Sequence, residues 1–130
     1  MANPPKMAPG KPVVLLMDDE QLLLDSLTPE LKTTCSLYTA TSIAEAEALL
    51  AERSYDVIIC DHMLPGDEQG LDFLVRTMET VPEMRRILIT GYTNPEFISR
   101  STSIGGLSAC LVKPIRASQI AGAIKSALSA

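Results

Sequence analysis

Polar side chains directly follow four of the five short apolar runs in the chain. They comprise three carboxylates, a hydroxyl and an ammonium group, on Asp18, Asp19, Asp61, Thr90 and Lys113. Such apolar runs are typical of buried parallel strands, and the ligand sites of open parallel sheets lie beyond the carboxyl ends of the strands. We therefore expect these five side chains to meet at one edge of a sheet.

The chemical types of these side chains suit phosphoryl transfer. Two carboxylates about 4 Å apart repel by roughly 4 kcal/mol at an effective dielectric constant near 20, so three of them together predict a bound cation. Ligation by oxygen atoms alone, with room for water, is typical of Mg²⁺. Lys113 adds a mobile positive charge, and Thr90 adds a hydroxyl donor. An aspartate in such a site can itself be the nucleophile and form an aspartyl phosphate.

Short apolar runs alternate with helical stretches along the chain. The run Val13–Met17 is apolar at every position, and further runs follow at residues 37–40, 55–60, 87–89 and 107–112. Between them, apolar residues recur at helical spacing. The stripes comprise Leu23, Leu27 and Leu31; Ile43, Ala46 and Leu50; Leu71, Leu74, Val75 and Met78; and Ile120, Ile124 and Leu128. Five strands alternating with five helices predict one α/β domain with a parallel sheet.

Local signals mark several helix boundaries. Ser42 and Glu45 match a capping box. Asn94 followed by Pro95 predicts the start of the fourth helix. Pro29 lies inside the first helical stretch and predicts an irregular helix there, because proline removes a backbone hydrogen bond.

The composition excludes several classes of protein. The 130 residues carry a net charge of −5, with 4% aromatic residues and no Trp, which disfavours nucleic-acid binding. Three cysteines without a CxxC pair and a single histidine disfavour a zinc site and predict a cytoplasmic protein with reduced thiols. The apolar runs are too short to span a bilayer. Residues 1–12, with four prolines, are interpreted as a flexible leader, and residues 13–130 as the domain.

Four segments together resemble the receiver domain of two-component response regulators, the CheY-like superfamily. They read Met-Asp-Asp-Glu at 17–20, Cys-Asp-His-Met-Leu-Pro-Gly at 60–66, Ile-Thr-Gly-Tyr at 89–92 and Leu-Val-Lys-Pro at 111–114. Each segment alone is a weak signal, but all four occur in order at predicted strand ends. The resemblance implies a flavodoxin-like α/β fold, a single doubly wound five-stranded parallel sheet of order 2-1-3-4-5 with helices on both faces.

The resemblance also implies a role for each acidic residue of the predicted site. Asp61 corresponds to the phosphoacceptor of the family. Asp19, Asp61 and the backbone carbonyl of Met63 correspond to ligands of Mg²⁺, and Asp18 corresponds to a residue that acts on the ion through water. Mg²⁺ is therefore the expected cofactor.

Thr90 and Lys113 correspond to the remaining catalytic residues of the family. The Thr90 hydroxyl is expected to swing towards the phosphoryl group, and Lys113 to bridge first to Asp61 and then to a phosphoryl oxygen. The resemblance also implies a cis peptide bond between Lys113 and Pro114. One residue departs from the family pattern, since Cys110 stands where a Tyr or Phe usually rotates inward on activation. The usual coupling of the threonine to an aromatic side chain therefore lacks its partner.

The resemblance implies a signalling phosphoacceptor and not an enzyme, limited to self-catalysed phosphotransfer and autodephosphorylation. The expected phosphoryl donor is a sensor histidine kinase or a histidine phosphotransfer protein. The expected target is an output domain in a longer parent chain or a separate protein, and a homodimer is left open. Contact with nucleic acid or a membrane is not expected. The alternative, which Cys110 keeps open, is a degenerate receiver that acts as a phosphorylation-independent protein-interaction module.

Other residues near Asp61 receive plainer interpretations. His62 lacks the partner residues of a metal site and is expected to be exposed. Asp67, Glu68 and Asp72 are interpreted as a solvated acidic rim. A nucleotide-binding enzyme is disfavoured, because acidic residues and not a glycine-rich loop follow the first strand.

Overall fold

One parallel sheet forms the centre of the molecule. The computed structural model describes residues 10–64, 66, 68–91 and 94–129, so the predicted leader falls outside the described residues up to residue 9. Five parallel strands lie in the order β2-β1-β3-β4-β5, which confirms the predicted doubly wound sheet. They are β1 (Val13–Met17), β2 (Ser36–Ala40), β3 (Val57–Asp61), β4 (Arg85–Thr90) and β5 (Ala109–Val112).

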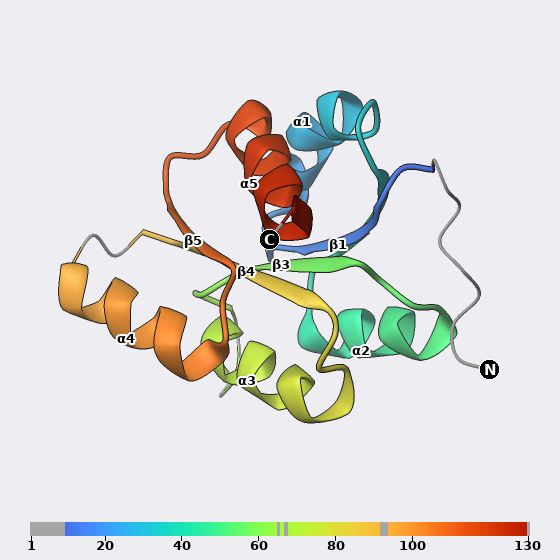
Figure 1. The fold of residues 1–130 in the computed structure, drawn as a ribbon. Coiled ribbons are helices and arrows are strands. Elements are labelled where there is room, and N and C mark those ends of the chain that lie inside the picture. The colour runs from blue at the N-terminus through green and yellow to red at the C-terminus, as the bar shows by residue number, and fades with distance from the viewer. Residues whose placement is uncertain (1–9, 65, 67, 92–93, 130) are drawn as a thin grey trace.

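Helices cover both faces of the sheet. Figure 1 shows α1 and α5 on one face and α2, α3 and α4 on the other. Within the described residues, none of the helices is long and apolar enough to cross a membrane. The helices are α1 (Gln21–Leu31), α2 (Ile43–Glu52), α3 (Gly70–Thr80), α4 (Pro95–Gly105) and α5 (Ala117–Ser129).

Side chains of the strands pack into two separate hydrophobic cores, one on each face of the sheet, because successive residues of a strand point to opposite faces. The core beneath α1 and α5 includes Val14, Leu16, Val57, Ile59, Ile87 and Ile89. The core beneath the other three helices includes Leu15, Met17, Ile58, Cys60 and Leu88. All five positions of β3 are buried, as expected for a central parallel strand covered on both faces. Packing in the two cores fixes the position of the carboxyl ends of the strands, where the polar residues of the predicted site lie.

The helix α1 continues through Pro29 without interruption, whereas the sequence predicted an irregular helix there. Pro29 stands in the last turn, where it leaves the carbonyl of Asp25 without its usual helical donor. Asp25 is exposed, so water can reach that carbonyl. A hydrogen bond from water can therefore replace the helical hydrogen bond that Pro29 removes.

The stripe predicted for α5 is correct at Ile120 and Ile124 but wrong at Leu128. Leu128 is 39% exposed, whereas Ala127 is buried in the core beneath the helix. Residues three and four positions after Ile124 both lie near its helical face, so spacing alone does not separate them. The carbonyl of Ala127 accepts a hydrogen bond from Arg85 Nε at 3.0 Å, which is one of the contacts between this turn and β4.

The predicted helix starts of α2 and α4 are confirmed. Ser42 Oγ accepts a hydrogen bond from the Glu45 N–H at 3.1 Å, but the Glu45 carboxylate accepts from the N–H of Thr41 and not from that of Ser42. The acidic half of this capping box is thus displaced by one residue. Asn94 Oδ1 accepts from the Glu96 N–H at 2.8 Å, with proline as the first helical residue.

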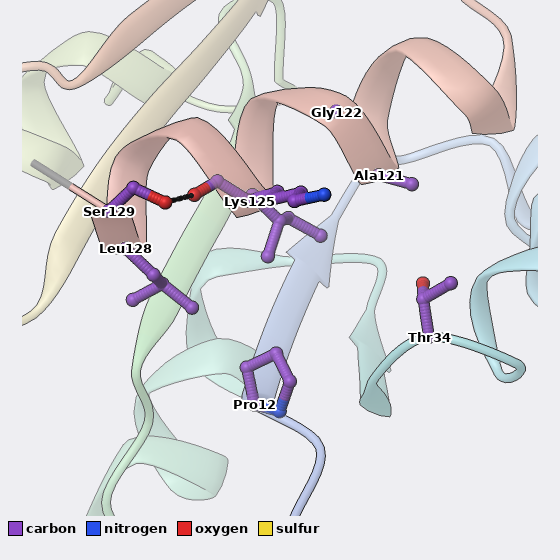
Figure 2. A pocket seen from close by; sticks show the side chains of 8 residues that line it. Pro12, Thr34, Ala121, Gly122, Lys125, Leu128 and Ser129 are labelled. Carbon is purple, nitrogen blue, oxygen red and sulfur yellow. Dashed lines mark hydrogen bonds between the residues drawn. The ribbon is translucent and has the colours of Figure 1, made fainter.

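An apolar groove of about 470 Å³ runs along α5. Figure 2 shows that it is lined by Ala121 and Leu128 of α5, by Pro12 before β1 and by Thr34 before β2. Pro12 and Thr34 precede the amino ends of their strands, so the groove lies at the opposite edge of the sheet from the predicted site.

Candidate functional site

Three carboxylates meet at the carboxyl edge of the sheet. Asp18 directly follows β1, and Asp61 is the last residue of the neighbouring strand β3. One carboxylate oxygen from each of Asp18, Asp19 and Asp61 lies within 4.8 Å of the others. Asp18 and Asp61 are each only 3% exposed, whereas Asp19 is open to solvent. The fold therefore brings together the three acidic residues that follow β1 and end β3.

Lys113 reaches the same cluster from the end of β5. Its Nζ lies 3.2 Å from Asp61 Oδ1 and 3.6 Å from Asp18 Oδ2. Its backbone N–H donates to the Thr90 carbonyl at 2.8 Å, which ties the residue to the end of β4. The Lys113–Pro114 peptide bond is cis, as predicted. A single ammonium group thus bridges the two buried carboxylates.

Burial controls the ionisation of these groups. It raises the pKa of Asp18, although the Glu20 N–H, which donates to Asp18 Oδ1 at 2.9 Å, and the Lys113 charge oppose the shift. Burial and then the Asp18 charge raise the pKa of Asp61. Burial alone would lower the pKa of Lys113, but the Asp61 and Asp18 carboxylates outweigh it and raise that pKa. Without a bound cation, the cluster therefore resists full ionisation.

The donor set fits a hard divalent cation. Among the described residues, the cluster offers carboxylate oxygens and neither imidazole nor thiolate, which is the donor chemistry of Mg²⁺ or Ca²⁺ sites. Three carboxylates against one ammonium group leave two negative charges, which a divalent cation would balance. Met63, whose carbonyl is the predicted additional ligand, lies in the loop that leaves β3 beside this cluster.

Thr90 belongs to β4, which lies between β3, where Asp61 ends the strand, and β5, which Lys113 follows. It ends β4, is fully buried, and follows Ile89, the residue that pairs with Asp61. Strand alternation places Thr90 and Cys110 on the same face of the sheet, and Cys110 is partly buried against the core beneath α2, α3 and α4. A thiol therefore stands where an aromatic ring is usual in the resembled family.

The sequence interpretation missed two features next to Asp61. His62 was expected to be exposed, but its ring is only partly exposed and packs edge-on against Phe97 of α4, with 5.1 Å between ring centroids. Gly70, the first residue of α3, lies directly against the end of β3, where a Cβ atom would overlap the Asp61 carbonyl oxygen. The available signal was a glycine at the start of an amphipathic stretch, which can mark a close backbone approach.

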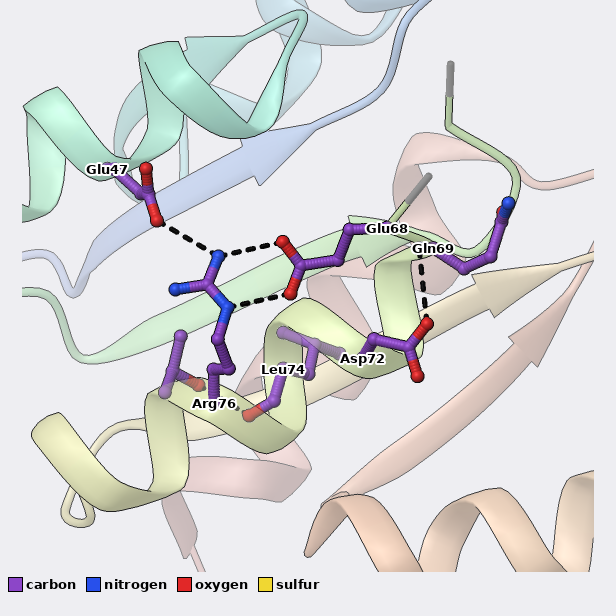
Figure 3. A network of polar contacts seen from close by, with 7 residues as sticks. Glu47, Glu68, Gln69, Asp72, Leu74 and Arg76 are labelled. Atoms are coloured by element: carbon purple, nitrogen blue, oxygen red, sulfur yellow. Dashed lines mark hydrogen bonds and ion pairs between the residues drawn. The ribbon is translucent and has the colours of Figure 1, made fainter. Parts of the chain in front are cut away.

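The prediction of a solvated acidic rim holds for Asp72, which is exposed, whereas Glu68 is only partly exposed and forms an ion pair. The Glu68 carboxylate accepts two hydrogen bonds from Arg76, at 2.7 and 2.9 Å (Figure 3). Asp72 accepts from the Gln69 N–H at 3.3 Å and caps the start of α3. Asp67, the third member of the predicted rim, lies outside the described residues.

Comparison with known proteins identifies the family. A family model described as the response regulator receiver domain matches residues 14–125. The chain belongs to this family. The receiver domain is 33% identical over 124 residues to the hydrogenase transcriptional regulatory protein HoxA of Cupriavidus necator, a match that covers 95% of this chain and 26% of HoxA. The chain thus spans about a quarter of the length of the HoxA proteins that it matches.

Other relatives agree with this assignment. The DNA-binding transcriptional activator DevR/DosR of Mycobacterium tuberculosis is 30% identical over 118 residues, which cover 86% of this receiver domain and 52% of the activator. Among solved structures, the signal receiver domain of an HD domain-containing protein from Pseudomonas fluorescens Pf-5 is 29% identical with a TM-score of 0.82. That match covers 92% of this chain and 95% of the other. The chain is a signalling phosphoacceptor domain and not a classical enzyme, and its family implies a kinase partner.

Proposed function

We propose that this receiver domain takes a phosphoryl group onto Asp61 from a sensor histidine kinase or a histidine phosphotransfer protein. An Asp61 carboxylate oxygen would form a bond to phosphorus as the phosphorus–nitrogen bond of the donor phosphohistidine breaks, and the electron pair of that bond would stay on the imidazole nitrogen. The observation that carries the proposal is the meeting of three carboxylates with the Lys113 ammonium group at one edge of the sheet.

Each residue of the cluster has a part in this proposal. Asp19, Asp61 and the Met63 carbonyl would hold Mg²⁺, with Asp18 acting through water, and the charge of the ion would offset that of the carboxylates and phosphoryl oxygens. Lys113, whose Nζ lies 3.2 Å from Asp61 Oδ1, would pair with a phosphoryl oxygen after transfer. Thr90 would donate its hydroxyl to another phosphoryl oxygen.

Signal output would end by hydrolysis in the same site. Water would attack phosphorus, the bond to Asp61 would break, and the carboxylate would re-form with release of inorganic phosphate. The match to a quarter of HoxA supports an output domain carried by a longer regulator. The three free cysteines support the predicted cytoplasmic location, where thiols stay reduced. Residues 13–130 would form the receiver and residues 1–12 its leader.

Incubation with acetyl phosphate tests the proposal directly. Intact mass should show a gain of one phosphoryl group that requires Mg²⁺ and is removed by hydroxylamine, the behaviour of an acyl phosphate. Asp61→Ala should show no gain, because it lacks the nucleophile. A wild-type chain that binds Mg²⁺ but accepts no phosphoryl group, either from acetyl phosphate or from phosphohistidine donors, would instead support a phosphorylation-independent interaction module.

Stabilisation by Mg²⁺ should depend on pH. Because burial raises the pKa of both Asp18 and Asp61, the folded protein binds more protons than the unfolded chain between the ordinary value near 4 and the raised values. The contribution of these groups to metal-free stability is therefore greatest below this interval and falls as pH rises through it. At neutral pH, Mg²⁺ at ten times its Kd should raise the free energy of unfolding by about 1.4 kcal/mol.

Thermal unfolding with and without MgCl₂ at several pH values measures this dependence. Near pH 4 the increase should shrink, since protonated carboxyl groups do not bind the cation. NaCl at matched ionic strength is the control for general screening and should reproduce little of the effect at neutral pH. Equal Mg²⁺ stabilisation at pH 4 and pH 7.5 would contradict binding by the buried carboxylates.

A further inference from the structure

Arg76 of α3 contacts the β3–α3 loop through Glu68, α2 through Glu47, and its own helix through Phe73. Its Nε and Nη2 donate to the two carboxylate oxygens of Glu68 at 2.7 and 2.9 Å, in a bidentate arrangement. Nη2 also lies 2.9 Å from the carboxylate of Glu47 in α2. The guanidinium carbon lies 5.2 Å from the centroid of the Phe73 ring, which is buried. Figure 3 shows Glu68 and Glu47 on neighbouring sides of this guanidinium group.

Glu68 belongs to the loop between β3 and α3, which also contains Met63. Two other side-chain contacts near the α3 end of the loop are longer, since the Leu64 N–H lies 3.4 Å from Gln69 Oε1 and the Gln69 N–H lies 3.3 Å from Asp72 Oδ2. Each of these bonds is near the limit for a hydrogen bond, whereas the two bonds from Arg76 are short and charge-assisted. The contact of Arg76 with Glu68 is therefore shorter than either of these two hydrogen bonds.

We infer that Arg76 is a positioning residue, which holds Glu68 at the α3 end of the β3–α3 loop and thereby affects how Met63, at the β3 end of the same loop, presents its carbonyl to Mg²⁺. This inference rests on the proposed function, since it concerns the same metal site. Groups that orient metal ligands without touching the metal commonly change affinity when they are replaced. Because Arg76 is half exposed, its replacement should change the Mg²⁺ affinity less than replacement of a buried positioning residue would.

Long-range electrostatics alone predicts tighter Mg²⁺ binding when Arg76 is replaced, whereas loss of positioning predicts weaker binding. Arg76→Gln removes a positive charge from the surroundings of an anionic pocket, and the long-range Coulomb effect of that change would strengthen cation binding. Loss of loop positioning would weaken it. The direction of the change in Mg²⁺ affinity therefore separates the two effects.

Amide chemical shifts of the ¹⁵N-labelled chain, followed through a MgCl₂ titration at constant ionic strength, give the Kd. Arg76→Gln and Glu68→Gln should each raise the Kd for Mg²⁺ by about fivefold. Arg76→Lys keeps the positive charge but cannot form the two parallel hydrogen bonds to Glu68, so its Kd for Mg²⁺ should rise as in Arg76→Gln. The matched control is Glu47→Gln, which removes the same charge as Glu68→Gln but leaves the loop contact in place, and it should change the Kd by less than about twofold.

Hydrogen exchange in the metal-free protein provides a second readout. Exchange of the Leu64 and Gln69 amides should accelerate in Arg76→Gln and Glu68→Gln but not in Glu47→Gln, while amides of β3 stay protected in all three. Unchanged or tighter Mg²⁺ binding by Arg76→Gln, or equal weakening by Glu47→Gln, would overturn the inference. Failure of the wild-type chain to bind Mg²⁺ would contradict the proposed function instead, and the exchange rates would still report whether Arg76 holds the loop.

Discussion

Asp61→Asn should accept no phosphoryl group, yet its metal-free form should unfold at a higher temperature than the wild-type chain. An amide is not a nucleophile towards phosphorus, so the labelled fraction should fall at least about a hundredfold. The rise in stability follows from the raised pKa of Asp61, because burial and the neighbouring Asp18 charge make the ionised form unfavourable in the folded protein.

The size of the stability change is modest because Lys113 offsets part of the repulsion. Its Nζ lies 3.2 Å from Asp61 Oδ1, and it can still donate to the amide oxygen of an asparagine at position 61. We expect a gain of about 1 kcal/mol at neutral pH, which corresponds to an increase of about 3–5 °C in Tm for a domain of this size. Stabilisation by Mg²⁺ should also be largely lost, because the substitution removes a carboxylate proposed to bind the ion.

Asp25→Asn is the matched control for this experiment. Asp25 is an exposed residue of α1, and its replacement removes the same charge without touching the acidic cluster. Its Tm should stay within about 1 °C of wild type, since exposed positions contribute little. A large loss of Tm in metal-free Asp61→Asn would show that Asp61 stabilises the fold by a contact other than those described.

The sheet and the acidic cluster were predictable because each depends on local pattern. A buried parallel strand leaves an apolar run in the sequence, and the residue after it must emerge at the carboxyl edge. The positions of Asp18, Asp61 and Lys113 after apolar runs are therefore enough to predict that these residues lie at the same edge of the sheet. The strand order was implied by the family resemblance, and the sheet has that order.

The errors arose where packing between distant elements decides the outcome. Ala127, and not Leu128, turns inward, because the rotation of α5 is set by what it packs against and not by its own spacing. Glu68 was assigned to solvent because its partner, Arg76, is eight residues away across a loop and a helix start. Helical spacing rules cover pairs three or four residues apart, so they give no signal for such a contact.

The close approach of α3 to β3 leads to the second large expected effect, that of Gly70→Ala. A Cβ atom at this position would overlap the Asp61 carbonyl oxygen and lie 2.8 Å from the carbonyl carbon of Asp61 and 2.9 Å from His62 Cα. These are backbone atoms, so they cannot rotate aside as a flexible side chain would. We expect a loss of about 3 kcal/mol or more in the free energy of unfolding, measured by chemical denaturation.

Two other glycines in helices make this prediction specific. A Cβ at Gly122 in α5 would meet no atom within 4 Å, so Gly122→Ala should stabilise the domain by about 0.5–1 kcal/mol through helix propensity. A Cβ at Gly105 would lie 3.0 Å from side-chain atoms of Leu71 and Leu107, which can adjust. Gly105→Ala should therefore fall between the other two variants.

The order of the three variants tests which property of Gly70 matters. If conformational freedom or helix propensity governed all three positions, the alanine variants would be alike, because none of these glycines has a positive φ. If contact with the end of β3 governs Gly70, its variant alone should be severely destabilised. Any folded Gly70→Ala protein should also accept phosphoryl groups more slowly, because relieving the overlap either displaces the backbone that carries Asp61 or moves the start of α3 away from it. A Gly70→Ala chain as stable as Gly122→Ala would contradict the close packing of α3 on β3.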